Sequence, residues 1–256
     1  MFLSPMTPTS PSGTSSAMVC TSPSPNVSTN ANYTISLGPF TIDIAAESST
    51  PRANPARPQF LKGITFNAGK EEEWKSTVLP YIRLLTFTVA STTDTFFISK
   101  MLQSLPDIDK NIPKVDMDGF HWFSGITDNR DSNPFLALAS NLPKLQEMAF
   151  TLHTSTVTDS RLDERQLLEL EQTDPERSKE RRTRSVMNVV SRFGMETIFN
   201  NKSLKHVRLV YIKSDMVAAY TVQGNPENVI AGIKDWLVEG FKKQSQEVVV
   251  ELSRAS

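Results

Sequence analysis

The stretch NLPKLQEMAFTLHTS, residues 141–155, decides the fold because versions of it return along the chain. Each version begins with an apolar residue that Pro or Lys usually follows, and apolar residues then alternate with other residues. The other versions are VLPYIRLLTFTVAST from Val78, NIPKVDMDGFHWFSG from Asn111 and KSLKHVRLVYIKSD from Lys202. Their first apolar residues are 33, 30 and 62 residues apart, counted from Leu79, Ile112, Leu142 and Leu204. Because the last interval is close to twice the others, the pattern is typical of stacked repeats.

The segments between these versions have helical patterns. Residues 94–106 begin with an Asp suited to an N-cap and place apolar residues four apart, at Phe97, Met101 and Leu105. Residues 133–143 begin with Asn-Pro and end at a second Pro, which is typical of a short helix. Strands that are joined through helices on one side run parallel. We therefore predict an α/β fold, a small repeat-like parallel sheet with helices on one face; the alternative is an α+β mixed sheet.

The interval between the third and fourth versions is too long for one repeat. Residues 185–199 carry an apolar stripe and can supply the helix of that repeat. This leaves a charged insertion at about 157–184, which we expect to contain an exposed helix or an ordered loop over 161–172. Insertions in repeat folds fall on one face, which is often the binding face.

The C-terminal part has a different pattern. We expect a strand over 215–224, then a helix that Asn225 caps and Pro226 starts, then a buried strand over 247–253. Together these elements would cap the end of the repeat stack. The expected core includes residues from all of these segments: Leu79, Ile82, Leu85, Phe87, Leu145, Met148, Phe150, Val207, Leu209, Trp236 and Val249.

The first part of the chain differs in composition. Residues 1–31 are more than half Ser, Thr and Pro, and we expect a disordered tail there, followed by a single α/β domain over 32–256. Residues 33–44 alternate as extended structure that Gly38-Pro39 interrupts. A Pro-rich connector over 48–59 precedes a strand-like stretch over 60–66, and residues 71–78 are a polar turn or the start of a helix.

Composition excludes several classes of partner. The net charge is −1 and the pI about 6.3, so no overall basic field attracts nucleic acid or anionic lipid. No apolar run is long enough to cross a bilayer, so we expect neither nucleic acid nor membrane as a partner. A single cysteine, Cys20, excludes an internal disulfide and favours a cytoplasmic or nuclear location.

The chain carries no catalytic signature. It lacks a Gly-rich phosphate loop, a Gly-x-Ser-x-Gly elbow and a His-Glu-x-x-His motif. Its three histidines, His121, His153 and His206, have no metal-ligand spacing. A calcium-loop pattern begins at Asp107, but Ile112 stands where such loops need Gly. We assign no catalytic, metal-binding or cofactor-binding residue, and an enzyme of unrecognised type remains the alternative to a binding protein.

Two groups of residues are candidates for contact with a protein partner. The first is Phe120, His121, Trp122 and Phe123, whose aromatic rings cannot all point inward on a strand; either part of the group is exposed or a neighbouring element buries it. The second is Arg181, Arg182 and Arg184, at the end of the run ERSKERRTR. These arginines would form a phosphate-binding patch or a nuclear localisation signal, or they would belong to a solvated helix with internal ion pairs.

Residues 78 to about 214 resemble a short leucine-rich-repeat array, especially the irregular arrays of fungal F-box-type proteins. The resemblance rests on LPYIRLLTF, IPKVDMDGF, LPKLQEMAF and LKHVRLVYI. It implies an adaptor whose repeat surface binds a target protein, which the sequence does not identify. No F-box-like helix bundle precedes the repeats, and the asparagine usual after the strand is replaced at Ala90, His153 and Asp215. A structural protein without a partner is a further alternative.

Overall fold

The computed structural model describes residues 40–43, 71–126 and 130–255. Of the extended segment expected at 33–44, residues Phe40–Asp43 form the strand β1, as the alternation after Gly38-Pro39 predicts. The expected tail at 1–31, the Pro-rich connector at 48–59 and the strand-like stretch at 60–66 lie outside the described residues.

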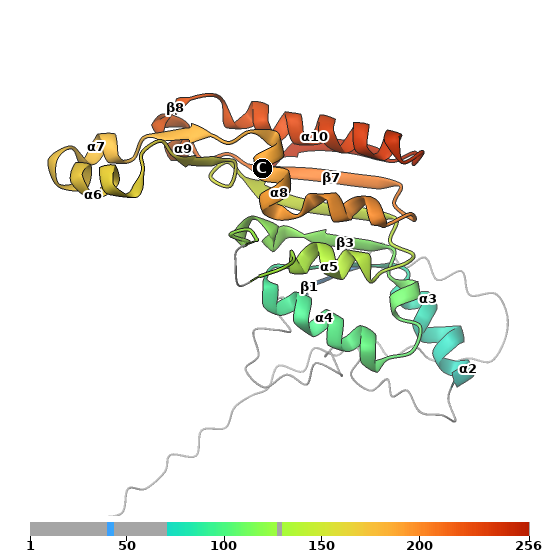
Figure 1. Cartoon of the computed structure of the whole chain (residues 1–256). Helices are drawn as coiled ribbons and strands as arrows, with labels where there is room; N and C mark the ends of the chain where they lie inside the picture. Colours follow the sequence, from blue (N-terminus) through green and yellow to red (C-terminus); the bar gives the residue numbers. More distant parts are fainter. Residues whose placement is uncertain (1–39, 44–70, 127–129, 256) are drawn as a thin grey trace, which may run out of the picture. The chain divides into compact units, whose positions relative to one another are not determined.

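The main sheet is parallel throughout, and its six strands follow one another in chain order. Each strand pairs only in parallel with its neighbours in this series. Figure 1 shows the strands layered one above another. This arrangement confirms the α/β fold rather than the mixed α+β sheet. The strands are β1, β2 (Leu85–Thr88), β3 (Lys114–Met117), β4 (Glu147–His153), β7 (His206–Ile212) and β9 (Val249–Arg254).

Helices cover one face of this sheet. They lie in a row in front of the strands in Figure 1, and each joins one strand to the next in the series. The helices are α4 (Thr92–Ser104), α5 (Pro134–Ser140), α8 (Val186–Phe193) and α10 (Pro226–Lys243). The helical start expected at 71–78 is also present, and it continues as α2 (Glu71–Glu73), the π-helical turn η2 (Trp74–Val78) and α3 (Leu79–Ile82).

Side-chain caps fix where the helices begin. Asn225 caps α10, as predicted, and Asn133 caps α5, whose first turn holds the expected Pro. The prediction for α4 was wrong by three residues, since Ser91 and not Asp94 is its N-cap, and Ser91 Oγ accepts from the Asp94 N–H at 3.2 Å. Asp94 Oδ2 instead accepts from the Ala90 N–H at 2.9 Å, so each of the two side chains accepts from a backbone N–H group at the start of the helix.

The register of the sheet shows that the four repeat starts expected from the sequence are not equivalent positions. Phe87, Val115, Met148, Val207 and Val250 lie side by side in one row across the strands. The expected starts Ile112 and Leu204 lie three residues before this row. Leu142 lies six residues before it, and Leu79 lies inside α3. In the repeats that begin at Leu79 and Leu142, a helical turn or a loop turn therefore precedes the strand. The shared Leu-Pro and Ile-Pro pairs in the sequence cannot reveal this difference.

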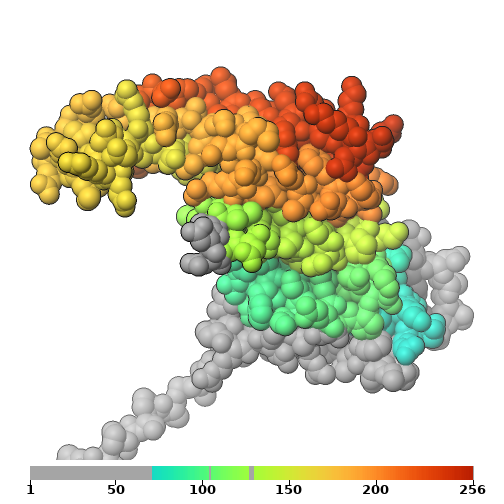
Figure 2. Space-filling model, in the orientation of Figure 1, coloured from blue at the N-terminus to red at the C-terminus, as the bar shows by residue number. Residues whose placement is uncertain are grey.

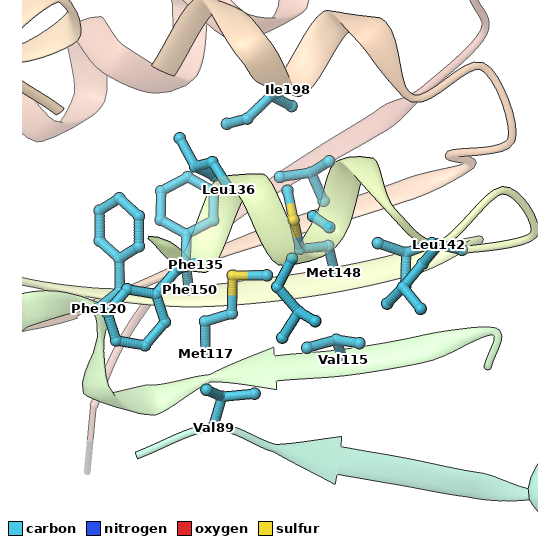
Figure 3. Packing of buried hydrophobic residues seen from close by; sticks show 14 of the residues in the cluster. Val89, Val115, Met117, Phe120, Phe135, Leu136, Leu142, Met148, Phe150 and Ile198 are labelled. Atoms are coloured by element: carbon cyan, nitrogen blue, oxygen red, sulfur yellow. The ribbon is translucent and has the colours of Figure 1, made fainter. Parts of the chain in front are cut away.

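The hydrophobic core lies between the sheet and the helices. Figure 3 shows side chains of β3 and β4, with Val89 just after β2, packed against α5 and against the 3₁₀ helix η5 (Met195–Asn200). Of the expected core residues, nine are buried: Leu79, Ile82, Leu85, Phe87, Leu145, Met148, Phe150, Val207 and Leu209. Trp236 is only partly buried, and Val249 is 59% exposed, so the expectation that β9 is fully buried was wrong. Val249 lies in register with His206, in a row of side chains that points away from the helices, whereas Val250 lies in the buried row.

The charged insertion forms a second sheet and an arm. Strand β5 (Thr158–Ser160) pairs antiparallel with β6 (Arg181–Thr183), and β6 pairs in parallel with β8 (Thr221–Gln223). Between β5 and β6 lie α6 (Glu164–Thr173) and α7 (Pro175–Ser178), neither of which has a buried residue. Figure 2 shows this arm projecting from the stacked sheet and helices.

Two expectations for this region were wrong. Residues 215–224 are not one strand, because α9 (Asp215–Tyr220) precedes β8 and Ser214 Oγ caps it by accepting from the Val217 N–H. The run ERSKERRTR is not one helix. Its helical part, which contains Arg177, ends at Ser178, and Arg181 and Arg182 lie in β6, which pairs with β5.

Candidate protein-binding surface

The face of the sheet opposite the helices carries charged side chains in register. We call this the open strand face, and its charged members are Lys114, Asp116, Glu147, His206, Arg208 and Glu251. Neighbouring strands pair these charges. Lys114 Nζ lies 2.8 Å from Glu147 Oε1, and His206 Nε2 lies 3.2 Å from Glu251 Oε2, an ion pair when the imidazole is protonated. The face is therefore polar and mixed in charge.

The third ion pair of this face spans a strand. Arg208 Nη2 lies 3.3 Å from Asp116 Oδ2, although β4 separates the strands that carry them. The residue between them in the register is Ala149, whose methyl group leaves room for the arginine to pass over it. Burial raises the pKa of Asp116, Arg208 opposes that shift and nearby Asp118 adds to it. A second positive group at this point would therefore stabilise the ionised carboxylate.

The turn after β3 presents one large aromatic side chain to solvent. This turn is the 3₁₀ helix η4 (Asp118–Trp122), and it exposes 78% of Trp122. Phe120 and Phe123 on either side are buried, and the ring of Phe120 lies 5.1 Å from that of Phe150, centroid to centroid. The ring of His121 lies against the indole, with centroids 4.6 Å apart.

The reason for this split differs from the one that the sequence indicated. The four residues lie on a 3₁₀ turn and its exit rather than on a strand, and such a turn has a period of three residues. Phe120 and Phe123 therefore point the same way, into the core, while His121 and Trp122 point outward. Gly119 permits the turn because a Cβ there would lie 2.0 Å from the Ala90 carbonyl oxygen.

The end of β4 places further polar groups beside this turn. Thr151 Oγ1 donates to Asp118 Oδ1 at 3.2 Å, which connects β4 to the turn. Burial lowers the pKa of His153, and the nearby charge of His121 lowers it further. We call Asp118, His121, Trp122, Thr151 and His153 the carboxyl-edge cluster, since all of them lie at or after the carboxyl ends of β3 and β4.

His153 of this cluster and the nearby Ser155 have the distances expected of a base and its nucleophile, but they form a short turn. Ser155 Oγ lies 2.6 Å from His153 Nδ1, and the Ser155 N–H donates to the same nitrogen at 3.0 Å. Because one lone pair receives both donors, the arrangement closes a turn between residues two apart. A cavity beside the second sheet is lined by none of the three histidines. His206 lies at the amino end of β7, away from the carboxyl-edge cluster.

The predicted arginines lie elsewhere, on the second sheet. Arg181 Nε donates to Thr158 Oγ1 at 2.9 Å, and Arg184 Nη2 lies 3.0 Å from Asp159 Oδ1. Arg182 points away from the strand face of Arg181 and is exposed. These residues follow the end of β4 through β5, so the two predicted groups occupy the same carboxyl end of the main sheet but belong to different sheets.

Several residues of this surface were missed by the sequence patterns. The alternation along IPKVDMDGF and LKHVRLVYI marks Asp116 and Arg208 as outward residues, but their pairing depends on which strands are neighbours. Among the described residues, no group of three or more His, Cys, Asp or Glu side chains could hold a metal ion. Within the same residues, no helix has the length and apolar composition that crossing a membrane requires.

Comparison with known proteins gave no relative. No protein-family model matches the chain, and neither a curated protein nor a solved structure matches it significantly.

Proposed function

We propose that this chain is a protein-recognition module of leucine-rich-repeat-like architecture, without enzymatic activity. Its binding surface would be the open strand face together with the carboxyl-edge cluster. Parallel strands in chain order with helices on one face support the repeat-like architecture. The single cysteine supports a cytoplasmic or nuclear location.

The observation that carries this proposal is the exposure of Trp122. A tryptophan side chain is normally buried in large part, and exposed aromatic side chains on a rigid backbone segment are typical of binding hot spots. The turn η4 that carries Trp122 is rigid because the buried rings of Phe120 and Phe123 anchor it on both sides of the indole. The Gly119 N–H also donates to the Val89 carbonyl at 2.9 Å, and the Phe123 N–H donates to the Phe120 carbonyl at 3.1 Å. The indole therefore loses little conformational entropy when a partner covers it.

The charges around Trp122 indicate what a partner would present. Asp116 has a raised pKa and lies beside Asp118, so a Lys or Arg side chain of the partner would be favoured there. The open strand face also carries paired charges of both signs, which select among partners more than they add to affinity. The expected ligand is a protein surface with an apolar pocket for the indole and a basic group beside it.

A pair of matched variants tests this proposal. Trp122→Ala removes the exposed aromatic residue of the turn, and Phe96→Ala removes a 55% exposed aromatic residue from α4 on the helical face. The purified full chain and both variants are used to capture proteins from native extract, and quantitative mass spectrometry compares the captured proteins. Binding of each captured protein is then measured with purified components.

We expect a partner that wild type and Phe96→Ala bind equally and that Trp122→Ala binds at least about 30-fold more weakly, which corresponds to a hot spot of about 2 kcal/mol. Equal binding by all three proteins would place the interface elsewhere and would refute the proposal. Circular dichroism checks that Trp122→Ala keeps the fold, which its exposure leads us to expect.

A further inference from the structure

A cavity of about 360 Å³ lies between the second sheet and the first turn of α8. Its polar lining comes from β5, β6, the start of α8 and β8, and it includes Asp159, Arg182, Arg184, Ser185, Asn188 and Gln223. The surface proposed above leaves this cavity unused.

The two arginines of this cavity differ in how many partners they have. Arg184 is held in place, because Nη2 pairs with Asp159, Nε donates to the Thr158 carbonyl at 3.2 Å and Nη1 donates to Asn188 Oδ1 at 3.3 Å. Asp159 Oδ1 receives this arginine and also accepts from the Ser160 N–H at 3.0 Å. Arg182 is exposed and forms no ion pair with any described residue.

More positive charge surrounds the cavity than its lining alone contains. Burial lowers the pKa of Arg184, and although Asp159 opposes that shift, the nearby charges of Arg192, Arg181 and Arg182 add to it. Three guanidinium groups thus lie close enough to Arg184 to disfavour its positive charge, and Asp159 is the acidic residue of the cavity lining. An anion bound beside Arg182 would relieve this repulsion.

The geometry points to this cavity as the binding site for a phosphate monoester on a serine or threonine side chain of the partner, a conclusion that rests on the proposed function. A guanidinium group offers paired N–H donors that match phosphate oxygens, and a phosphate monoester carries nearly two negative charges at neutral pH. Arg182 would contact the phosphate directly, while Arg184 and the positive end of α8 contribute a favourable potential. Asp159 lies opposite Arg182 in the register of β5 and β6, and its ion pair with Arg184 offsets part of its repulsion of the anion.

The arm beside the cavity indicates why a peptide rather than a polyanion is the ligand. From the N-cap of α6 to the end of α7, residues 163–178, the arm has six acidic side chains and two basic side chains, Arg165 and Arg177. Nucleic acid or an anionic membrane would bring many negative charges against this arm, and repulsion would oppose binding. A phosphorylated peptide with Lys or Arg beside the phosphorylated residue would satisfy both the basic cavity and the acidic arm.

Fluorescence anisotropy with the purified full chain tests this inference. The probe is a labelled peptide pool with a central phosphoserine among Lys, Arg and randomised residues, compared with the same pool without phosphate. We expect the phosphorylated pool to bind at least about tenfold more tightly, and inorganic phosphate to compete with it. Binding should weaken from pH 7.5 to pH 5, because the phosphate loses its second charge near pH 6.

Two arginine variants locate the site. Arg182→Ala removes the unpaired guanidinium of the cavity, and Arg165→Ala removes an exposed arginine from the arm, with the same change in net charge. We expect Arg182→Ala to remove the tenfold preference for phosphate and Arg165→Ala to change affinity by less than about twofold. Equal binding of the two pools, or equal losses in the two variants, would overturn the inference.

Two further results separate this inference from other sources of phosphate and from the proposed function. Phosphatidylcholine vesicles that contain phosphatidylinositol 4-phosphate are tested in parallel. Arg182-dependent binding of these vesicles in preference to the peptide would overturn the assignment to a protein ligand. If Trp122→Ala abolishes partner capture but phosphate is not recognised, the cavity inference alone fails. If phosphopeptide binds through Arg182 and no partner depends on Trp122, the proposed strand-face surface fails instead.

Discussion

Asn201 joins two neighbouring repeats, and its replacement should uncouple them. The residue is buried at the entry to β7. Its Nδ2 donates to the Ala139 carbonyl at 3.1 Å and to the Leu142 carbonyl at 3.2 Å, and its Oδ1 accepts from the Ser203 N–H at 3.1 Å. The two carbonyls belong to the C-terminal end of α5 and its exit, and each also accepts from one backbone N–H group, that of Leu142 or Leu145, at 3.1 Å.

The expected loss follows from these three hydrogen bonds. Each contributes a net 0.5–1.5 kcal/mol, so losing all three in Asn201→Ala should reduce the free energy of unfolding by about 2–4 kcal/mol, although both carbonyls keep a backbone donor. Asn201→Asp should reduce it more at pH 7, because a carboxylate would face two carbonyl oxygens. Its folded-state pKa would therefore be raised, and part of the stability should return as the pH falls and the carboxyl group becomes protonated.

Urea unfolding with two tryptophan probes measures both the loss and the coupling. Trp74 is buried before β2 and Trp236 lies in α10 before β9, so they report opposite ends of the strand series. Single-tryptophan versions of wild type should unfold with coincident transitions. In Asn201→Ala the two transitions should separate, because stability in stacked folds depends on the contacts between neighbouring units.

A nearby asparagine provides the control. Asn141 is exposed at the end of α5, so Asn141→Ala should change the free energy of unfolding by less than about 0.5 kcal/mol. A loss below about 0.5 kcal/mol in Asn201→Ala, with both probes still coincident, would show that the buried amide does not couple the repeats.

Two further predictions concern the carboxyl edge. Gly119→Ala should reduce the free energy of unfolding by about 3 kcal/mol or more in urea titrations, because its Cβ would lie 2.0 Å from the backbone oxygen of Ala90. In Gly232→Ala the new Cβ meets a side-chain methyl of Val186 that can move, and a loss as large as that of Gly119→Ala would contradict this reasoning. The imidazole of His153 should titrate by NMR below its usual pKa of 6.5, and since the lowered pKa favours the neutral folded form, its contribution to stability should be present above pH 6.5 and decrease as the pH falls through the folded pKa. His153→Gln should lose this pH dependence, and an unchanged profile would assign it to other groups.

Local signals in the sequence were sufficient for most helices of the fold. The Asn-Pro pairs at 133–134 and 225–226 each begin a helix that was predicted from them, with Asn225 as the expected N-cap. They succeed because capping involves residues three or four positions apart, so the evidence lies within one short window. The same kind of signal was present and overlooked at Ser91 and Ser214, which begin α4 and α9.

The candidate surface was predictable only in part. The sequence indicated that the aromatic rings of the group at residues 120–123 could not all be buried, but the assumption of a strand gave no means of telling which one is exposed. The 3₁₀ turn decides this, and the turn depends on the close approach of Gly119 to the backbone after β2. The contact between Arg208 and Asp116 likewise requires Ala149 to lie between them, and 92 residues of chain separate the two charges.

The sequence by itself determined the class of the fold, the order of its strands and most of its core. It could do so because the spacing of apolar residues and the caps of helices are properties of neighbouring residues. A recurring strand-helix unit with short connections also favours parallel strands stacked in chain order, which the structure shows. Only the tertiary structure decided the register of the strands, the exposure of Trp122 and the cavity beside Arg182. These depend on pairings between segments far apart in the chain, where a shift of a few residues leaves the local pattern unchanged but alters every contact across the sheet.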